Sequence, residues 1–257
     1  PFPFSMHAEL VFYWLSALGR PSPQSLSIRT VPPPLMADAI REGEIDAFCV
    51  GEPWGSKAVE SGMGELLLPG CAIWAFAPEK VLAVRRDWAE ARPDLSGRLI
   101  RAVWRAGRWL DTADGRSLAA ELLSRPAYLG LAPDLVERGL SGRLTIAASG
   151  ETRTASRFVR FHEGLANFPW RSQAAWIGSQ LAARTGLDRS QAMSAAGTVF
   201  RSDIYRAALE TTTAELPAGS SRVEGSLSSD SRGATARGEA IWLRDDFFDG
   251  RTFEPPF

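Results

Sequence analysis

Strand and helix signals alternate through the first third of the chain, and this alternation constrains the fold more than any other feature. The run Ile45–Val50 (IDAFCV) is mostly apolar and leads into a helical stretch from Trp54 to about Ser61. The β-prone run Ser27–Val31 leads in the same way into a helix at Leu35–Glu42. Strand–helix–strand units of this spacing favour a parallel sheet covered by helices, so we predict an α/β fold.

The pattern of predicted secondary structure changes after Glu79. We predict a strand at Lys80–Arg85 and, after it, mainly helices. The segment 217–238 is rich in Ser, Gly, Ala and Arg, so it offers too few large apolar side chains to offset the entropy of ordering. The predicted organisation is a βαβ domain (1–78), a return strand with C-terminal helices (79–216), a flexible loop (217–238) and a C-terminal tail (239–257). The predicted helices are 5–18, 35–42, 54–61, 95–110, 117–123, 133–138, 170–184 and 203–213.

Composition and motifs exclude several classes of function. The chain has 29 basic and 30 acidic side chains, so it lacks the general basic footprint of a nucleic-acid-binding protein. It has no apolar run of the ~18 residues that a transmembrane helix needs. Two cysteines and two histidines give no disulfide scaffold and no metal-ligand spacing. Because P-loop, GxGxxG and GxSxG patterns are also absent, we predict a protein that is not an enzyme and has no cofactor.

Two candidate binding points lie where a predicted strand runs into a helix, the usual ligand position in open α/β sheets. At Ser5-Met6-His7 the start of a helix could hold a small anion, although Ser5 is equally explained as a helix N-cap. At the Gly51–Trp54 turn, Trp54 could wall a cleft or belong to the core. Glu52 in this turn could take part in ligand binding, or its negative charge could simply stabilise the start of the helix through the helix dipole.

The third candidate is Lys80. Only two of the basic residues are lysines, Lys57 and Lys80. An ammonium group at the boundary between the βαβ part and the helical part could neutralise an anion held between two lobes. The alternative is a solvated surface lysine.

Six short runs in this order resemble the nitrate- and bicarbonate-binding proteins of ABC importers and their cytoplasmic nitrate-sensing relatives. The proline triplet followed by FCVGEPW is the most specific of them. The runs are Pro3–His7 (PFSMH), Val31–Met36 (VPPPLM), Ile45–Trp54 (IDAFCVGEPW), Pro78–Leu82 (PEKVL), Ala166–Ser172 (ANFPWRS) and Phe248–Phe253 (FDGRTF).

The resemblance implies a periplasmic-binding-protein-like fold of type II, in which two lobes close on one oxyanion about a hinge. Residues 1–78 would form the second lobe and the later helices would return to the first. Because the chain begins at Pro1, we expect a fragment or processed product that lacks most of the first lobe. The family's cationic ligand falls on Lys80. Phe4-Ser5 stands where transporter-type members carry a glycine, and this departure is typical of sensor-type members.

The resemblance therefore implies a solute-binding protein that delivers nitrate or nitrite to the membrane subunits of an ABC importer. Such a protein would be periplasmic or anchored on the outer face of the inner membrane. The alternative is a cytoplasmic nitrate sensor that sequesters an RNA-binding antiterminator controlling nitrate assimilation. The expected ligand-binding residues are Lys80, Ser5, Met6, His7, Glu52 and Trp54, with no metal. Bicarbonate-binding relatives also use calcium, for which Glu52 is the one candidate carboxylate.

Overall fold

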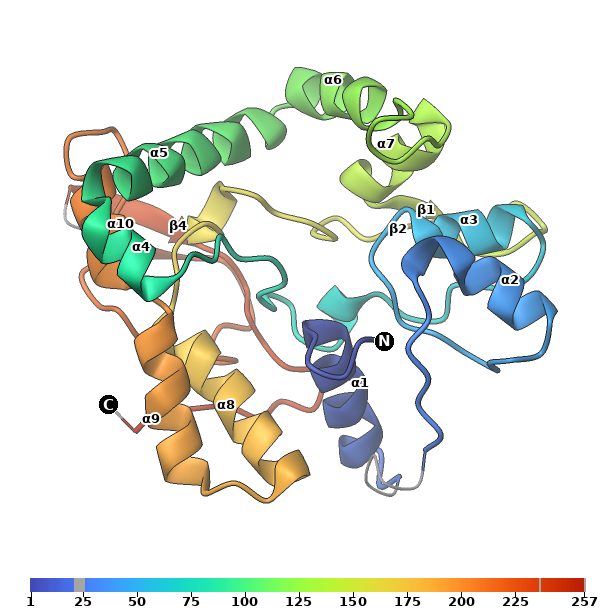
Figure 1. Ribbon diagram of the computed structural model, residues 1–257, viewed down its shortest axis with the longest axis horizontal. Coiled ribbons are helices and arrows are strands. Elements are labelled where there is room, and N and C mark those ends of the chain that lie inside the picture. Colours follow the sequence, from blue (N-terminus) through green and yellow to red (C-terminus); the bar gives the residue numbers. More distant parts are fainter. Residues whose placement is uncertain (21–25, 236, 257) are drawn as a thin grey trace. The chain divides into compact units, whose positions relative to one another are not determined.

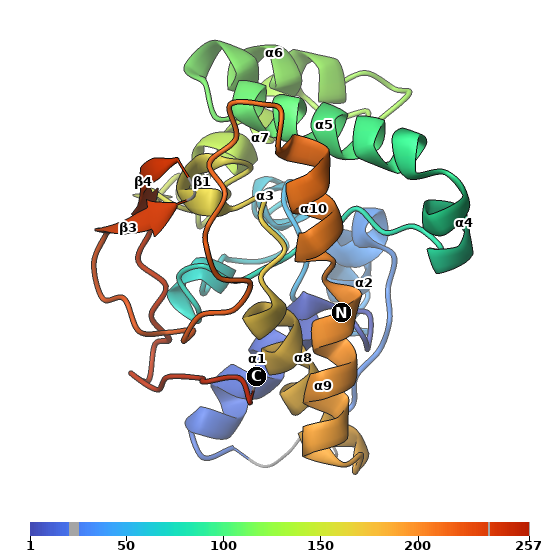
Figure 2. The same cartoon turned by 90° about the vertical axis from the view of Figure 1, so that its left-hand side faces the viewer.

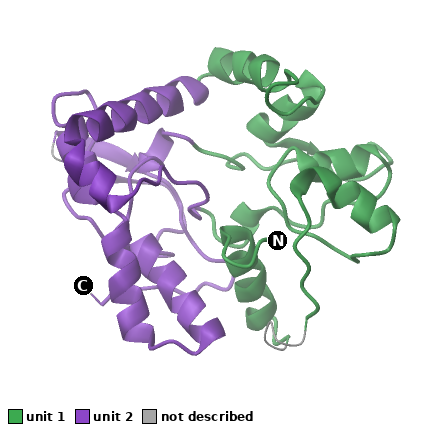
Figure 3. Cartoon of the chain, in the orientation of Figure 1, with its two compact units in different colours: residues 1–75, 112–160 green, residues 76–111, 161–257 purple. Residues whose placement is uncertain are grey.

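The structure, a computed structural model, describes residues 1–20, 26–235 and 237–256. The chain divides into two compact units, each assembled from stretches that are not contiguous in sequence. Unit 1 comprises residues 1–75 and 112–160, and unit 2 comprises residues 76–111 and 161–257 (Figure 3). This division differs from the predicted 1–78 and 79–216, because residues 112–160 join the first unit.

Unit 1 consists of short helices and one hairpin (Figure 1). Its elements are α1 (Met6–Ala17), η2 (Pro33–Leu35), α2 (Met36–Arg41), α3 (Trp54–Glu60), η3 (Gly70–Ala72), α6 (Ala113–Leu123), α7 (Pro133–Ser141), β1 (Arg143–Thr145) and β2 (Thr152–Thr154). The predicted helices near 5–18, 35–42 and 54–61 are confirmed. Helix α1 is also capped by the residue that the sequence indicated, Ser5.

Unit 2 is mainly helical and carries a second hairpin (Figure 2). Its elements are α4 (Arg86–Ala91), α5 (Pro93–Leu110), η4 (Glu163–Leu165), α8 (Arg171–Thr185), α9 (Arg189–Val199), α10 (Ser202–Leu209), β3 (Ser231–Thr235) and β4 (Gly238–Trp242). Helices α8 and α9 lie side by side. A Cβ added at Gly178 of α8 would lie 2.6 Å from the carbonyl oxygen of Ala192 in α9, so this glycine permits their close approach.

The core of unit 2 is aromatic. Trp104 of α5 packs with Phe168, Trp170 and Tyr205, and Leu209 of α10 closes the cluster. The Phe168 and Tyr205 rings meet edge to face with centroids 5.5 Å apart. The contacts of Phe168 with Trp104 of α5 and Tyr205 of α10 thus hold the loop 161–168 against α5.

The predicted parallel strands differ from the structure. Both sheets in the described residues are two-stranded and antiparallel, β1 with β2 and β3 with β4. The runs 27–31, 45–50 and 80–85 are irregular, and Phe2–Ser5 forms a turn closed by the Ser5 amide on the Phe2 carbonyl. A strand exists only through hydrogen bonds to a neighbouring strand, so an apolar run alone does not make one. In the described chain, none of these runs has such a neighbour.

The segment predicted as a flexible loop has ordered contacts. Residues 217–238 contain β3, and the side chains of Pro217 and Glu224 are fully buried. The tail 239–257 contains most of β4, and Phe253 pairs with Glu224 through two main-chain hydrogen bonds of 2.8 and 2.9 Å. Residues 236 and 257 of these two predicted segments lie outside the described residues.

Candidate functional site

The first predicted point, at the start of α1, is a well-formed helix N-cap. The Ser5 hydroxyl accepts a hydrogen bond from the Ala8 amide at 3.3 Å and donates one to the Phe2 carbonyl at 2.7 Å. Met6 and His7, both half-buried, form the first helical turn. The Ser5 side chain is therefore committed to the backbone, and the capping interpretation holds for that atom.

The second point is the turn that leads into α3. The Glu52 carboxylate accepts a hydrogen bond from the Ser56 amide at 3.1 Å, and the Glu52–Pro53 peptide bond is cis. Burial raises the pKa of Glu52 above its ordinary value, although the Ser56 hydrogen bond works in the opposite direction. Trp54 opens α3 and is half-buried. Glu52 thus holds the turn together with the first turn of α3.

The structure brings these two points together within unit 1. A Cβ added at Gly51 would lie 3.7 Å from Cε1 of His7. Position 51 therefore abuts the imidazole at ordinary van der Waals distance. The imidazole of His7, the first turn of α1 and the Gly51–Trp54 turn therefore lie in one neighbourhood.

Lys80 lies in unit 2, in the irregular stretch before α4. Its side chain is 83% exposed and forms an ion pair with Glu79. The other lysine, Lys57, is also exposed, as expected for the solvated side of α3. The six predicted ligand residues are therefore divided, five in unit 1 and Lys80 in unit 2.

Sequence reasoning missed a buried charge cluster in unit 2. Arg222 donates to Glu224 at 3.1 and 3.2 Å and lies 3.5 Å from Asp245. Its guanidinium also stacks on the rings of Phe76 and Trp170, each 5.0 Å from the ring centroid. Burial raises the pKa of both carboxyls, and the Arg222 charge opposes this. The polar residues around Arg222 gave no signal of burial.

Across 1–20, 26–235 and 237–256, no group of three or more His, Cys, Asp and Glu side chains could hold a metal ion. In the same residues, no helix is both long and apolar enough to cross a membrane.

Residues 1–124 match the NMT1-like family. The chain is 32% identical over 180 residues to the nitrate import ATP-binding protein NrtC of Synechocystis sp., covering 70% of this chain and 27% of that protein. It is 28% identical over 257 residues to the nitrate/nitrite binding protein NrtA of Synechococcus elongatus, covering 99% of this chain and 54% of that protein. The chain thus spans between about a quarter and about half of these relatives.

A solved structure gives the fold. The crystal structure of the periplasmic nitrate-binding protein NrtA from Synechocystis PCC 6803 matches with a TM-score of 0.83 and 25% identity. The match covers 99% of this chain and 62% of that chain. The fold is therefore periplasmic-binding-protein-like, and the resemblance to nitrate- and bicarbonate-binding proteins of ABC importers is confirmed.

Proposed function

We propose, from this relationship to nitrate- and bicarbonate-binding proteins, that the chain binds a small oxyanion, most readily nitrate or nitrite. It would act as the solute-binding component of an ABC importer, in the periplasm or on the outer face of the inner membrane, and not as an enzyme. The single observation that carries the proposal is the match over 99% of the chain to proteins whose names state nitrate binding. The sensor alternative gains no support from these relatives.

The residues of unit 1 have the chemistry that a planar anion needs. The first turn of a helix offers main-chain N–H groups and the positive end of the helix dipole. His7 adds a ring N–H donor, and half-buried Trp54 can supply an apolar wall. Ser5 and Glu52 are committed to the backbone, so we assign them to holding the helix start and the turn in position.

Lys80 supplies the one full positive charge in the proposal. Nitrate carries a single charge, so one ammonium group in a partly dehydrated site would balance it. A compact ammonium also fits a small anion better than the wider guanidinium fork does. The exposed position of Lys80 leaves its ammonium accessible to such a ligand.

Isothermal titration of the purified protein with nitrate, nitrite and bicarbonate tests the proposal. We expect Lys80→Ala to weaken nitrate binding about tenfold or more, because a charge-assisted hydrogen bond contributes ~1.5–3 kcal/mol. Lys57→Ala is the matched control and should leave the affinity unchanged. Equal nitrate affinities for the two alanine variants would show that Lys80 is only a surface lysine. Absence of binding to all three anions would overturn the proposed function.

A further inference from the structure

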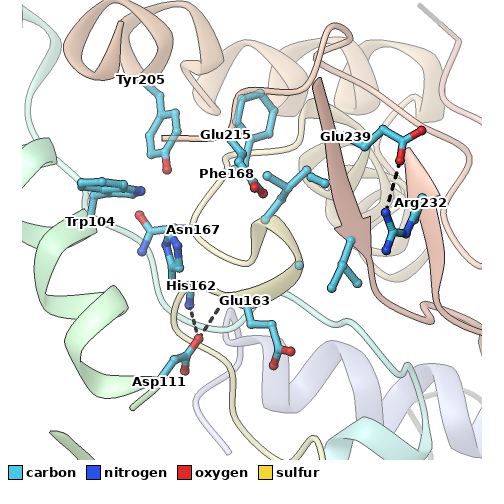
Figure 4. A pocket seen from close by; sticks show the side chains of 14 residues that line it. Trp104, Asp111, His162, Glu163, Asn167, Phe168, Tyr205, Glu215, Arg232 and Glu239 are labelled. Atoms are coloured by element: carbon cyan, nitrogen blue, oxygen red, sulfur yellow. Dashed lines mark hydrogen bonds and ion pairs between the residues drawn. The ribbon is translucent and has the colours of Figure 1, made fainter. Parts of the chain in front are cut away.

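Unit 2 contains a cavity of about 350 Å³ that the proposed anion site does not use. Four side chains that differ in chemistry, Trp104, His162, Asn167 and Tyr205, converge on it in Figure 4. They come from α5, the loop 161–168 and α10. Phe168 adds an apolar wall, and Glu215 lines the same space.

The loop that carries His162 and Asn167 is held firmly. The Asp111 carboxylate, at the end of α5, accepts hydrogen bonds from the main-chain amides of Phe161, His162 and Glu163 at 3.3, 2.9 and 2.7 Å. A Cβ added at Gly107 would lie 2.8 Å from the Phe161 carbonyl oxygen, so α5 and the loop are in close contact. The polar groups of the cavity are therefore preorganised, and a ligand would not have to order them.

One acceptor atom in the lining of this cavity is uncommitted, and it belongs to Asn167. Nδ1 of His162 also lacks a hydrogen-bond partner among the described residues, but it is buried within the cavity wall. Nδ2 of Asn167 donates to the Phe161 carbonyl at 2.8 Å, which fixes the amide and leaves Oδ1 available as an acceptor. An amide oxygen that the loop fixes in place and leaves without a donor indicates a place for a donor.

The charges of the cavity select the kind of donor. Its lining includes four acidic side chains, Asp111, Glu163, Glu215 and Glu239. Its one arginine, Arg232, is ion-paired with Glu239 at 3.5 Å. Burial lowers the pKa of His162, which disfavours a positive charge on its ring. An anion would meet net negative charge here, and an apolar molecule would leave the Asn167 acceptor unpaired.

We propose that this cavity binds a small primary amine in its ammonium form. The ammonium donates a hydrogen bond to Oδ1 of Asn167, and its charge is balanced by the Glu215 carboxylate. The alkyl group packs against the rings of Phe168 and Tyr205. This site lies entirely within unit 2 and differs from the oxyanion site in the sign of its ligand.

The two histidines of the chain make the test direct, because each unit holds one of them. The purified protein is titrated with n-butylammonium chloride while the imidazole signals are followed by NMR. We expect a saturable shift of the His162 signals and no shift of the His7 signals. Nitrate, titrated separately as its sodium salt, should move His7 and leave His162 unchanged.

Substitutions provide a second test of the amine site. Glu215 is exposed, so Glu215→Gln should fold normally and weaken n-butylammonium binding about threefold to tenfold, as expected for the loss of one partly screened charge. Glu210→Gln, at an exposed position that does not line the cavity, should leave binding unchanged.

Three results would overturn the amine site. They are the absence of a saturable His162 shift, an equal shift with uncharged n-butanol, and equal weakening by Glu215→Gln and Glu210→Gln. A His162 shift with n-butylammonium but no response to nitrate would support the amine site and contradict the proposed function alone.

Discussion

Replacing Arg222 with methionine should destabilise unit 2 severely. The substitution keeps most of the side-chain volume but removes the only cation that the structure places on Glu224 and Asp245 in the described chain, and both carboxylates have an exposed fraction of 0%. Removing one partner of a buried ion pair costs about 3–5 kcal/mol, because the remaining charge cannot reach water. The lost stacking on Phe76 and Trp170 acts in the same direction.

The stability lost in Arg222→Met should depend on pH, and the direction of that dependence follows from the pKa of Glu224. Burial raises the pKa of Glu224 in the folded protein, so folding favours its protonated form. Its contribution to stability is therefore fully present below the unfolded pKa and is lost as pH rises through the folded pKa. In Arg222→Met the opposing arginine charge is gone, so the folded pKa rises further. The variant should lose more stability at pH 8 than at pH 5.

Urea denaturation followed by tryptophan fluorescence at both pH values measures the effect. At pH 8 the midpoint should fall by about 1–2 M, given a slope of roughly 3 kcal/mol per M for a chain of this size. Arg244→Met is the matched control, since Arg244 pairs with Asp246 on the surface and surface pairs contribute little. A loss equal to that of Arg244→Met, or one that is the same at pH 5 and pH 8, would refute the reasoning.

Two further predictions concern the helix cap of α1 and the segment 217–238. Ser5→Ala should lower the free energy of unfolding by about 1 kcal/mol in a denaturation curve, because the Ala8 amide loses its acceptor, whereas Ser228→Ala, at an exposed position, should change nothing. Deleting residues 217–238 should abolish the cooperative thermal transition of unit 2, because the deletion removes Arg222, Glu224 and β3. An unchanged melting temperature after the deletion would restore the flexible-loop interpretation.

Local signals predicted the helices well, and pairings that span long distances in the sequence were not predictable. The caps, glycine stops and apolar spacing around α1, α2 and α3 depend on neighbouring residues, which the sequence displays directly. Helix α9 was missed because its alanines and its single glycine, Gly197, carry little amphipathic signal. Its packing against Gly178 decides its position, and that contact is made by another helix.

The candidate site shows the same difference between local features and contacts that are distant in the sequence. The cap at Ser5 was predictable from its neighbours, whereas the proximity of His7 and Gly51 was not, because the strands predicted before them do not form. The burial of Glu224 could not be expected, because one of its partners, Ser172, lies 52 residues away in α8. Its other partner, Arg222, lies two residues away in the same polar stretch. The polar composition of 217–238 predicted disorder, whereas these partners compensate the buried charge.

The interleaving of the two units has a consequence for biosynthesis. The polypeptide passes from one unit to the other at residues 75–76, 111–112 and 160–161. On the ribosome, unit 1 cannot close until residue 160 has left the exit tunnel, and residues 76–111 must wait for the C-terminal half of the chain. Helix α5 therefore emerges long before Phe168 and Leu209, the residues that cover its apolar face. During that interval the nascent chain exposes the Trp104 face of α5, which makes it a natural substrate for chaperones.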